Sequence, residues 1–194
     1  MKLNFITLIV IALCLVTPIV CHAQDNTKIT KNDIKITLLS IGSGSSRFTY
    51  ERAFNELQSA ELTLGVIGMG VDWMNESAPT GLLLKFAYKF NLIPQKNASS
   101  WLAGFYVKPE LVYASYDYDY QKDDNTFRDH TRRLALLAEC GYQLVLKWFV
   151  FDIYAGLGSA FGDINENNYY HSFMQLNKNS DLSVTSGFRV GVGF

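Results

Sequence analysis

Apolar and polar residues alternate with a period of two in eight successive segments of the chain. The clearest segment runs from Leu82 to Phe90, where every even-numbered residue is apolar while Lys85 and Lys89 fall on the opposite phase. This alternation is typical of β-strands with one apolar and one polar face. The segments lie at residues 34–38, 47–52, 61–66, 82–90, 105–113, 133–144, 149–158 and 188–194. We therefore predict an all-β fold, an eight-stranded antiparallel up-and-down β-barrel over residues 33–194.

The connections between these segments differ in length according to the end of the barrel at which they fall. With both termini on the periplasmic side, the first, third, fifth and seventh connections face outward. The outward connections at residues 117–131 and 163–181 are long and polar, the one at 72–80 is intermediate, and the inner turns at 55–59 and 146–148 are tight. Long external loops and short periplasmic turns are typical of outer-membrane barrels. Two connections fit less well, because Gly42–Gly44 is short for an outer loop and residues 91–100 are long for an inner turn.

Alternation alone does not say which face of the barrel is inside, and a soluble lipocalin-like barrel also has eight strands. Here the apolar phase is almost free of charge, with Arg52 as the exception. Aromatic residues also gather at strand ends, as expected of the two girdles of a lipid-embedded barrel. The inner set is Phe54, Tyr88, Phe90, Trp101, Tyr142, Trp148, Phe149 and Phe194, and the outer set is Phe48, Trp73, Tyr113 and Phe161. The pattern favours a transmembrane barrel.

The first 23 residues have the composition of a secretory signal peptide. Lys2 is followed by the uncharged, mostly apolar run Phe5–Val20, and Cys21-His22-Ala23 supplies small residues for cleavage. An uncleaved N-terminal anchor helix is the alternative, although the run is short for one. We predict cleavage after residue 23, a short periplasmic segment at 24–32, and export to the bacterial outer membrane.

The charge and the cysteine content limit the kinds of partner and site that we expect. The net charge is −1 and charged residues make up 18% of the chain, with no basic run, which argues against a nucleic-acid partner. Cys14 and Cys21 lie in the predicted signal peptide, so Cys140 remains alone. We therefore expect no disulfide, no Cys/His metal site and no cofactor.

Charges on the polar phase are the most informative set of side chains. In an eight-stranded barrel they point into a lumen just wide enough for side chains, where unpaired charges are very costly. We predict a paired lumen charge network; a proton relay or ion path is the alternative. Its members are Arg47, Lys85, Lys89, Lys108, Arg133 and Arg189 on the positive side and Glu51, Glu61, Glu110, Glu139 and Asp152 on the negative side.

The outer connections hold the remaining candidates for chemistry. His130-Thr131 and His171-Ser172 place a hydroxyl beside an imidazole, but neighbours on a strand point to opposite faces, which makes them poor catalytic partners. The run Tyr116-Asp-Tyr-Asp-Tyr120, followed by Asp123 and Asp124, has groups that bind a cation or a sugar. Calcium loops need six to eight oxygens in a defined order and a glycine that this run lacks, so solvated rim aromatics are the simpler interpretation.

The final segment resembles the terminal strand of outer-membrane proteins, which ends in an aromatic residue read by the barrel-assembly machinery. The matching positions are Phe188, Val190, Val192 and Phe194, with Arg189 where a glycine is common. Residues 48–54, 104–113 and 151–158 resemble small outer-membrane barrels of OmpA/OmpX-like architecture, closest to those frequent in Bacteroides-type bacteria. The resemblance implies fold, location, and outer-membrane lipid and the assembly machinery as partners. It implies no catalytic residues.

From these patterns we expect a non-enzymatic integral outer-membrane protein that contributes to envelope structure, or to surface recognition of an extracellular partner through its long outer loops. Three alternatives remain open at this point. They are a narrow channel or carrier for small hydrophobic molecules, a lipid-modifying hydrolase, and a soluble ligand-binding barrel.

Overall fold

The structure is a computed structural model, and it describes residues 29–72, 77–95, 100–122, 125–164, 168–177 and 180–194. The predicted signal peptide and Trp73 lie outside these residues. Among the described residues, no helix is long and apolar enough to cross a membrane. The strands are β1 (Asn32–Thr37), β2 (Ser43–Asn55), β3 (Gln58–Asp72), β4 (Ser77–Pro94), β5 (Gly104–Lys122), β6 (Asn125–Leu146), β7 (Phe149–Gly162), β8 (Met174–Asn177) and β9 (Ser180–Gly193), with one short helix, α2 (Leu38–Gly42).

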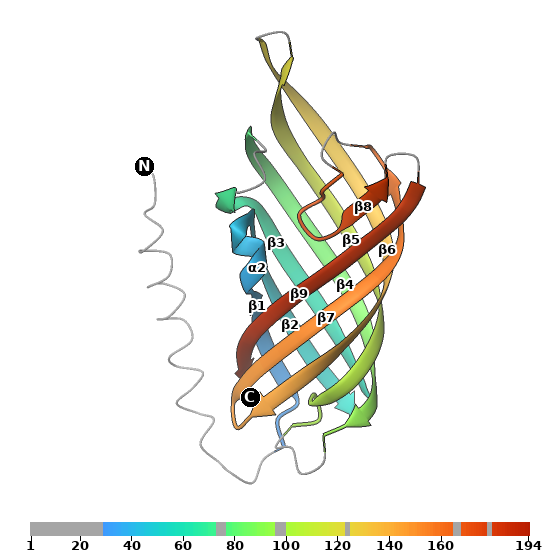
Figure 1. Cartoon of the computed structure of the whole chain (residues 1–194). Helices are drawn as coiled ribbons and strands as arrows, with labels where there is room; N and C mark the ends of the chain where they lie inside the picture. Colours follow the sequence, from blue (N-terminus) through green and yellow to red (C-terminus); the bar gives the residue numbers. More distant parts are fainter. Residues whose placement is uncertain (1–28, 73–76, 96–99, 123–124, 165–167, 178–179) are drawn as a thin grey trace, which may run out of the picture.

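Eight of these strands close into a ring (Figure 1). From β1 to β7 each strand pairs with the next along the chain in antiparallel fashion. β7 then pairs with β9, and β9 returns to β1 through the register Ile36↔Val190. The predicted eight-stranded antiparallel up-and-down barrel is confirmed. Closure gives every strand two neighbours, so the sheet has no open edge over the height of the barrel.

The two phases of the alternation separate as inside and outside. The even-numbered residues of the Leu82–Phe90 segment face outward, with Leu82 66% and Leu84 46% exposed, whereas Lys85 and Lys89 are buried. A soluble lipocalin-like barrel has the opposite arrangement, so that alternative is wrong. The outward face is an apolar belt, and Arg52 is exposed near its inner rim.

Three connections differ from the sequence prediction. The first outward connection is the helix α2, which takes Leu38 out of the predicted first strand and ends where Ser43 begins β2. The predicted loop 117–131 is instead a β-hairpin, because β5 and β6 continue their pairing to Lys122↔Asn125 beyond the barrel wall (Figure 1). The predicted loop 163–181 contains the short strand β8, which pairs with β9. The last ring strand starts at Ser180, eight residues before the predicted start at Phe188.

The lower end of the barrel, where the C-terminus lies, is covered by the connection between β4 and β5. Leu102 and Ala103 are buried, and Ala103 packs with Val145 and Val150 inside the last turn of the barrel. The backbone N–H of Trp101 donates to Thr30 O at 3.2 Å, which fixes this segment against the start of the chain. The unexpected length of the inner turn therefore serves to close this end.

Candidate functional site

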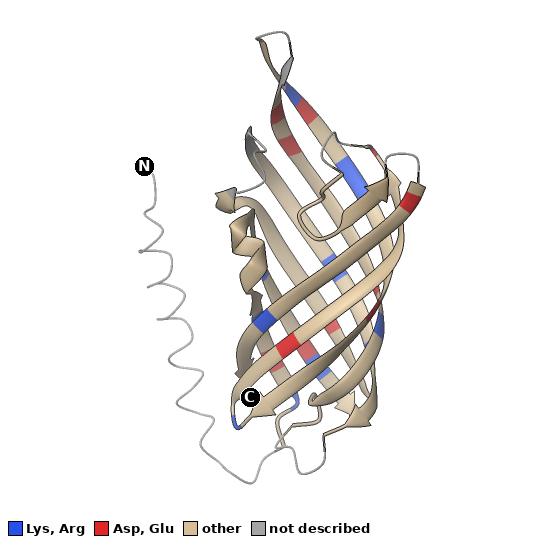
Figure 2. Cartoon of the chain, viewed as in Figure 1, with Lys and Arg blue, Asp and Glu red and all other residues tan. Residues whose placement is uncertain are grey.

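Charged residues are concentrated on the strands in the lower half of the barrel (Figure 2), and the buried side chains among them contact one another inside the lumen. At its centre, Lys35 Nζ donates to a carboxylate oxygen of Glu51 and, at 3.0 Å, to Glu61 Oε1. Gln143 Oε1 and Asp152 Oδ2 lie 3.1 and 3.4 Å from the same ammonium. Lys35 is fully buried, so this ring of acceptors replaces the water that its charge would otherwise need.

The network extends from this centre in two directions. On one side, Arg189 lies 2.5 Å from Asp152 Oδ2 and 3.1 Å from Glu61 Oε2. On the other, Lys108 contacts Glu61, and its Nζ lies 3.2 Å from both Glu110 Oε2 and Glu139 Oε2. The outlying pairs are Lys85 with Glu110 and Lys89 with Glu51, the latter at 2.9 Å. Nine of the eleven predicted network residues therefore meet in one connected set.

Lys35 and Asp33 belong to this set although the sequence analysis did not include them. Gln143 Nε2 donates to Asp33 Oδ2 at 2.7 Å, and Asp33 Oδ2 lies 3.6 Å from Lys35 Nζ. The sequence did indicate that Lys35 faces the lumen, because Lys35 falls on the polar phase of the first segment. Tyr106 is a further member, since its hydroxyl donates to Asp152 Oδ1 at 2.8 Å.

Two predicted members lie apart from the network. Arg47 is buried, with its Cγ 3.1 Å from where a Cβ of Gly65 would stand, and its Nε and Nη1 have no hydrogen-bond partner among the described residues. Arg133 donates instead to the carbonyl oxygens of Gly162, Asp163 and Ala160 and to Gln175 Oε1.

Arg133 thereby links the end of β7 to a plug in the outer mouth of the barrel, which it contacts through Gln175. The plug is the part of the β7–β9 connection that spans residues 168–177. Tyr170, His171 and Phe173 are each at most 2% exposed, and the Tyr170 ring stacks on Phe173 with centroids 5.1 Å apart. The Arg133 guanidinium lies over the Tyr170 ring at 5.2 Å. The plug packs on an apolar layer that separates it from the charges below. The layer contains Ile67, Leu83, Val112, Ala114, Tyr116, Tyr118, Ala135, Leu137 and Ala160.

The outer ends of β5 and β6, residues 115–132, form a hairpin whose tip projects beyond the barrel and which has two different faces. Tyr116, Tyr118 and Tyr120 form a row on the face that continues the lumen, with ring centroids 6.0 and 6.2 Å apart, and Phe127 stacks on Tyr120 at 5.7 Å. The aspartates between the tyrosines point to the opposite face, which makes a cation site from the whole run impossible. Asp123 and Asp124 lie outside the described residues, and among the described ones no group of three or more His, Cys, Asp or Glu is placed to hold a metal ion.

The outward face of the hairpin carries a polar cluster around His130. His130 Nδ1 lies 2.5 Å from Asp117 Oδ1, and its Nε2 lies 3.3 Å from Ser115 Oγ. The hydrogen bond with His130 is the main reason why the pKa of the Asp117 carboxyl is lowered from its usual 3.8. Arg132 Nε donates to the same His130 Nε2 at 3.0 Å.

This cluster has the order of a Ser-His-Asp chain, but two features oppose nucleophilic catalysis. The lone pair that a general base would use already accepts a hydrogen bond from a guanidinium. Ser115 also lies between two paired strands, opposite Leu82 and Arg132, so the backbone N–H groups there serve the sheet and do not form an oxyanion hole. The hydroxyls that follow the two histidines in the sequence are not placed for catalysis either. Thr131 points inward, away from His130, and Ser172 lies buried in the plug with His171.

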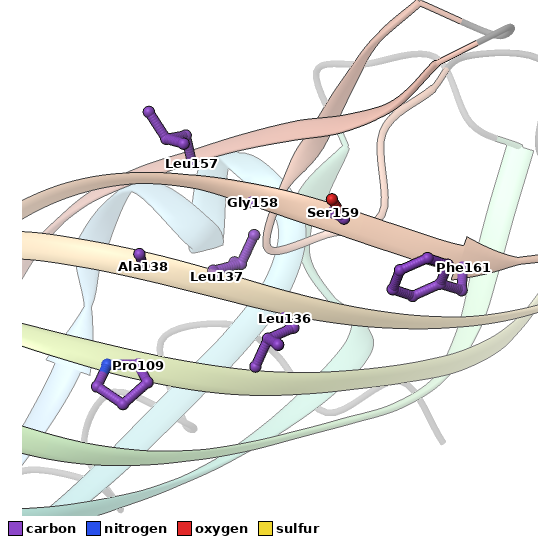
Figure 3. A pocket seen from close by; sticks show the side chains of 8 residues that line it. All are labelled: Pro109, Leu136, Leu137, Ala138, Leu157, Gly158, Ser159 and Phe161. Atoms are coloured by element: carbon purple, nitrogen blue, oxygen red, sulfur yellow. The ribbon is translucent and has the colours of Figure 1, made fainter.

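The outer wall has a shallow groove, formed where small side chains face outward between large ones (Figure 3). Ala138 and Ser159 lie on neighbouring strands, opposite Leu157 and Leu136 respectively, and Phe161 closes one end. The groove is part of the apolar belt. Cys140, the one free cysteine among the described residues, is exposed on the same face.

The predicted assembly-signal residues Phe188, Val190 and Val192 all lie on the outward face of β9. Val190 and Val192 pair with Ile36 and Ile34 of β1, where the ring closes. Phe194 is 42% exposed at the lower rim, and its backbone N–H donates to Asn32 O at 2.9 Å.

The architecture thus defines a closed β-barrel with an apolar exterior and a charged, filled interior, as in small outer-membrane barrels. A sequence model of the family described as "Cellulose biosynthesis protein BcsS" matches residues 96–164, just over a third of the chain. The N-terminal β-barrel domain of Pseudomonas aeruginosa OprF is similar in structure, with 13% identity and a TM-score of 0.48, covering 85% of this chain and 98% of that one. No protein of curated function matches the chain in sequence.

Proposed function

We propose that this protein is an integral barrel of the bacterial outer membrane that does not conduct solutes and acts through its outer end. The membrane assignment is supported by the apolar belt. On β6 the outward residues from Leu144 to Leu134 rise by about 25 Å, given roughly 3.3 Å per residue and a ~40° tilt, which matches the apolar band of outer-membrane barrels. Aromatic residues mark both limits, with Tyr142 and Phe149 below and Tyr113 and Phe161 above.

The membrane assignment is tested by fractionation and electrophoresis. A closed barrel keeps its hydrogen bonds in SDS until it is heated. The protein should therefore be extracted with outer membranes and run faster unheated than boiled. Recovery from the soluble periplasm with one mobility under both conditions would defeat the assignment.

The proposal that the barrel does not conduct solutes rests on its lumen, which described residues fill at three levels. The charge network centred on Lys35 occupies the lower half, the apolar layer lies above it, and the plug occupies the mouth. A narrow channel would need a continuous file of water through all three. We expect no sustained conductance from purified protein in a planar bilayer, and no sustained conductance from Arg189→Ala. Stable single-channel steps that change with Arg189→Ala or Glu139→Ala would establish the channel alternative.

A second candidate function is an accessory role in cellulose biosynthesis. The segment that matches the family of that name includes the whole projecting hairpin. The hairpin carries a row of aromatic rings, and pyranose rings pack their apolar C–H faces on such rings. Phe127 is 45% exposed and Tyr120 is half-buried, so these two are the rings that a glycan chain reaches.

Co-sedimentation with insoluble cellulose tests this role. The wild-type protein in detergent should co-sediment, and Phe127→Ser combined with Tyr120→Ser should abolish binding. Tyr142→Ser is the matched control, because Tyr142 is equally exposed (44%) but lies at the opposite rim. Equal loss with the control, or no binding by the wild type, would remove the hairpin as a glycan-binding surface.

A further inference from the structure

The upper limit of the apolar belt is marked by one row of paired residues across three strands. Tyr113 of β5 pairs with Leu134 of β6, and Leu134 pairs with Phe161 of β7. The next outward-facing row above it is Ser115 and Arg132, which are directly opposite one another, followed by Asp117 and His130. In a bilayer that fits the belt, this second row lies at the level of the lipid headgroups.

Arg132 differs from the other arginine on this face of the hairpin. Arg128 lies 3.6 Å from Asp117 Oδ2 and 3.8 Å from Asp119 Oδ1, so its charge is shared with two carboxylates. The Arg132 guanidinium makes no ion pair with a described carboxylate. It is exposed, and its single described hydrogen bond runs from Nε to Nε2 of His130.

Two contacts hold Arg132 in place. Its backbone N–H donates to Asp163 Oδ2 at 2.9 Å, which ties β6 to the end of β7. His130 is fixed by its contact with Asp117, and it in turn holds the Nε edge of the guanidinium. This leaves the two terminal nitrogens of Arg132 directed away from that edge, with the Ser115 hydroxyl on the neighbouring strand. An oriented guanidinium with a nearby hydroxyl suits a tetrahedral phosphate, which accepts two parallel hydrogen bonds.

We propose that Arg132, positioned by His130 and Asp117, binds the phosphate group of a lipid in the outer leaflet. This inference rests on the proposed membrane location. The ligand is a phosphorylated lipid because the site adjoins the belt directly: the acyl chains of such a lipid would lie along Tyr113, Leu134 and Phe161 while its phosphate meets Arg132. The polar cluster that has the order of a Ser-His-Asp chain is then a binding site whose imidazole orients an arginine.

Native mass spectrometry of the detergent-solubilised protein, titrated with diphosphoryl lipid A without divalent cations, tests the site. We expect Arg132→Gln to weaken binding about tenfold, the effect of one charge-assisted hydrogen bond. Arg132→Lys should recover only part of the affinity, because it keeps the charge but loses the fork. Arg128→Gln is the matched control, since it removes the same charge from the same face two rows higher, and it should bind as the wild type does.

Equal weakening by Arg128→Gln would show a diffuse electrostatic effect and overturn the site, as would wild-type binding by Arg132→Gln. Inorganic phosphate should not compete at the same concentration; full competition would mean that the site takes free phosphate and would overturn the lipid assignment. If the wild-type protein inserts into membranes but does not bind lipid A, the result contradicts this site alone. A protein that does not enter membranes at all counts against the proposed function as well.

Discussion

The ring of Tyr154 lies directly over Gly187 of the neighbouring strand, where a Cβ would stand only 2.5 Å from Tyr154 Cζ. Tyr106 lies over Gly141 in the same manner, again with 2.5 Å between its hydroxyl and the position of a Cβ. Both tyrosines are buried in the lumen. The glycines therefore leave the room in which large inward side chains lie flat across the adjacent strand.

Gly187→Ala should destabilise the barrel by about 1–3 kcal/mol, the usual cost of overpacking a filled interior. The free energy of unfolding, measured by urea titration with tryptophan fluorescence, gives the effect. Tyr154→Leu made in the Gly187→Ala background should lose less stability than Tyr154→Leu alone, because the clash is then gone. Strictly additive effects of the two substitutions would show that the ring does not need the glycine.

Leu84 and Lys85 are consecutive residues of β4 with opposite environments. Leu84→Arg should lower the stability of the inserted barrel by up to ~2–4 kcal/mol, because Leu84 is 46% exposed on the lipid-facing apolar belt. Residue 85 faces the lumen, so the leucine of Lys85→Leu does not contact lipid. The cost of this substitution comes from Glu110, which loses one of its two lysine partners.

The double variant Lys85→Leu with Glu110→Gln should therefore recover part of the loss caused by Lys85→Leu. The measurement is urea unfolding in liposomes. A harmless Leu84→Arg together with improved insertion of Lys85→Leu would mean that the two faces are reversed.

The period-two pattern was sufficient to predict the number of strands in the ring and the face to which their residues point, but not the short strand β8. It did not give the height of a side chain in the lumen, because height depends on the stagger between strands, which pairing around the whole ring determines. Arg47 and Arg133 share the inward phase with Lys108, yet they do not reach its carboxylates. Lys35 was omitted although its phase was correct. The pairing of β1 with β9 brings it to the centre of the charge network, and the alternation does not show that pairing.

The projecting hairpin was predicted as a loop because its composition is polar. The alternation in fact continues through it, with tyrosines on one face and aspartates on the other. What extends the strands is cross-strand pairing: Asp117 with His130, Asp119 with Arg128, and Tyr120 with Phe127. Such pairs stabilise a sheet only when the register brings them together, and the sequence did not fix that register.

Arg133→Ala should loosen the plug without opening the barrel. Its guanidinium donates to three backbone carbonyls and to Gln175, so its removal leaves buried acceptors unpaired. Hydrogen exchange at residues 168–177 should become faster by about one to two orders of magnitude, whereas exchange in the β1 and β9 strands should not change. Arg128→Ala is the control, because Arg128 is exposed on the outward face and does not touch the plug. Unchanged exchange in the plug would show that apolar packing of Tyr170 and Phe173 is enough to hold it.

The Asp117–His130 pair should make the hairpin sensitive to acid. The hydrogen bond with His130 lowers the pKa of Asp117 below its usual 3.8, followed by the charges of His130 and Arg128. A carboxyl with a lowered pKa stabilises the folded hairpin above its usual pKa, and this contribution disappears as the pH falls through the lowered value. A titration of the carboxyl carbon of Asp117 by NMR, in detergent, should give a midpoint below 3.8. His130→Phe should return the midpoint toward 3.8, and Ser115→Ala should leave it unchanged, because Ser115 contacts the far nitrogen of the imidazole. A midpoint that does not respond to His130→Phe would mean that Arg128 governs the carboxyl, and that His130 is not held by Asp117 in the way that the orientation of Arg132 requires.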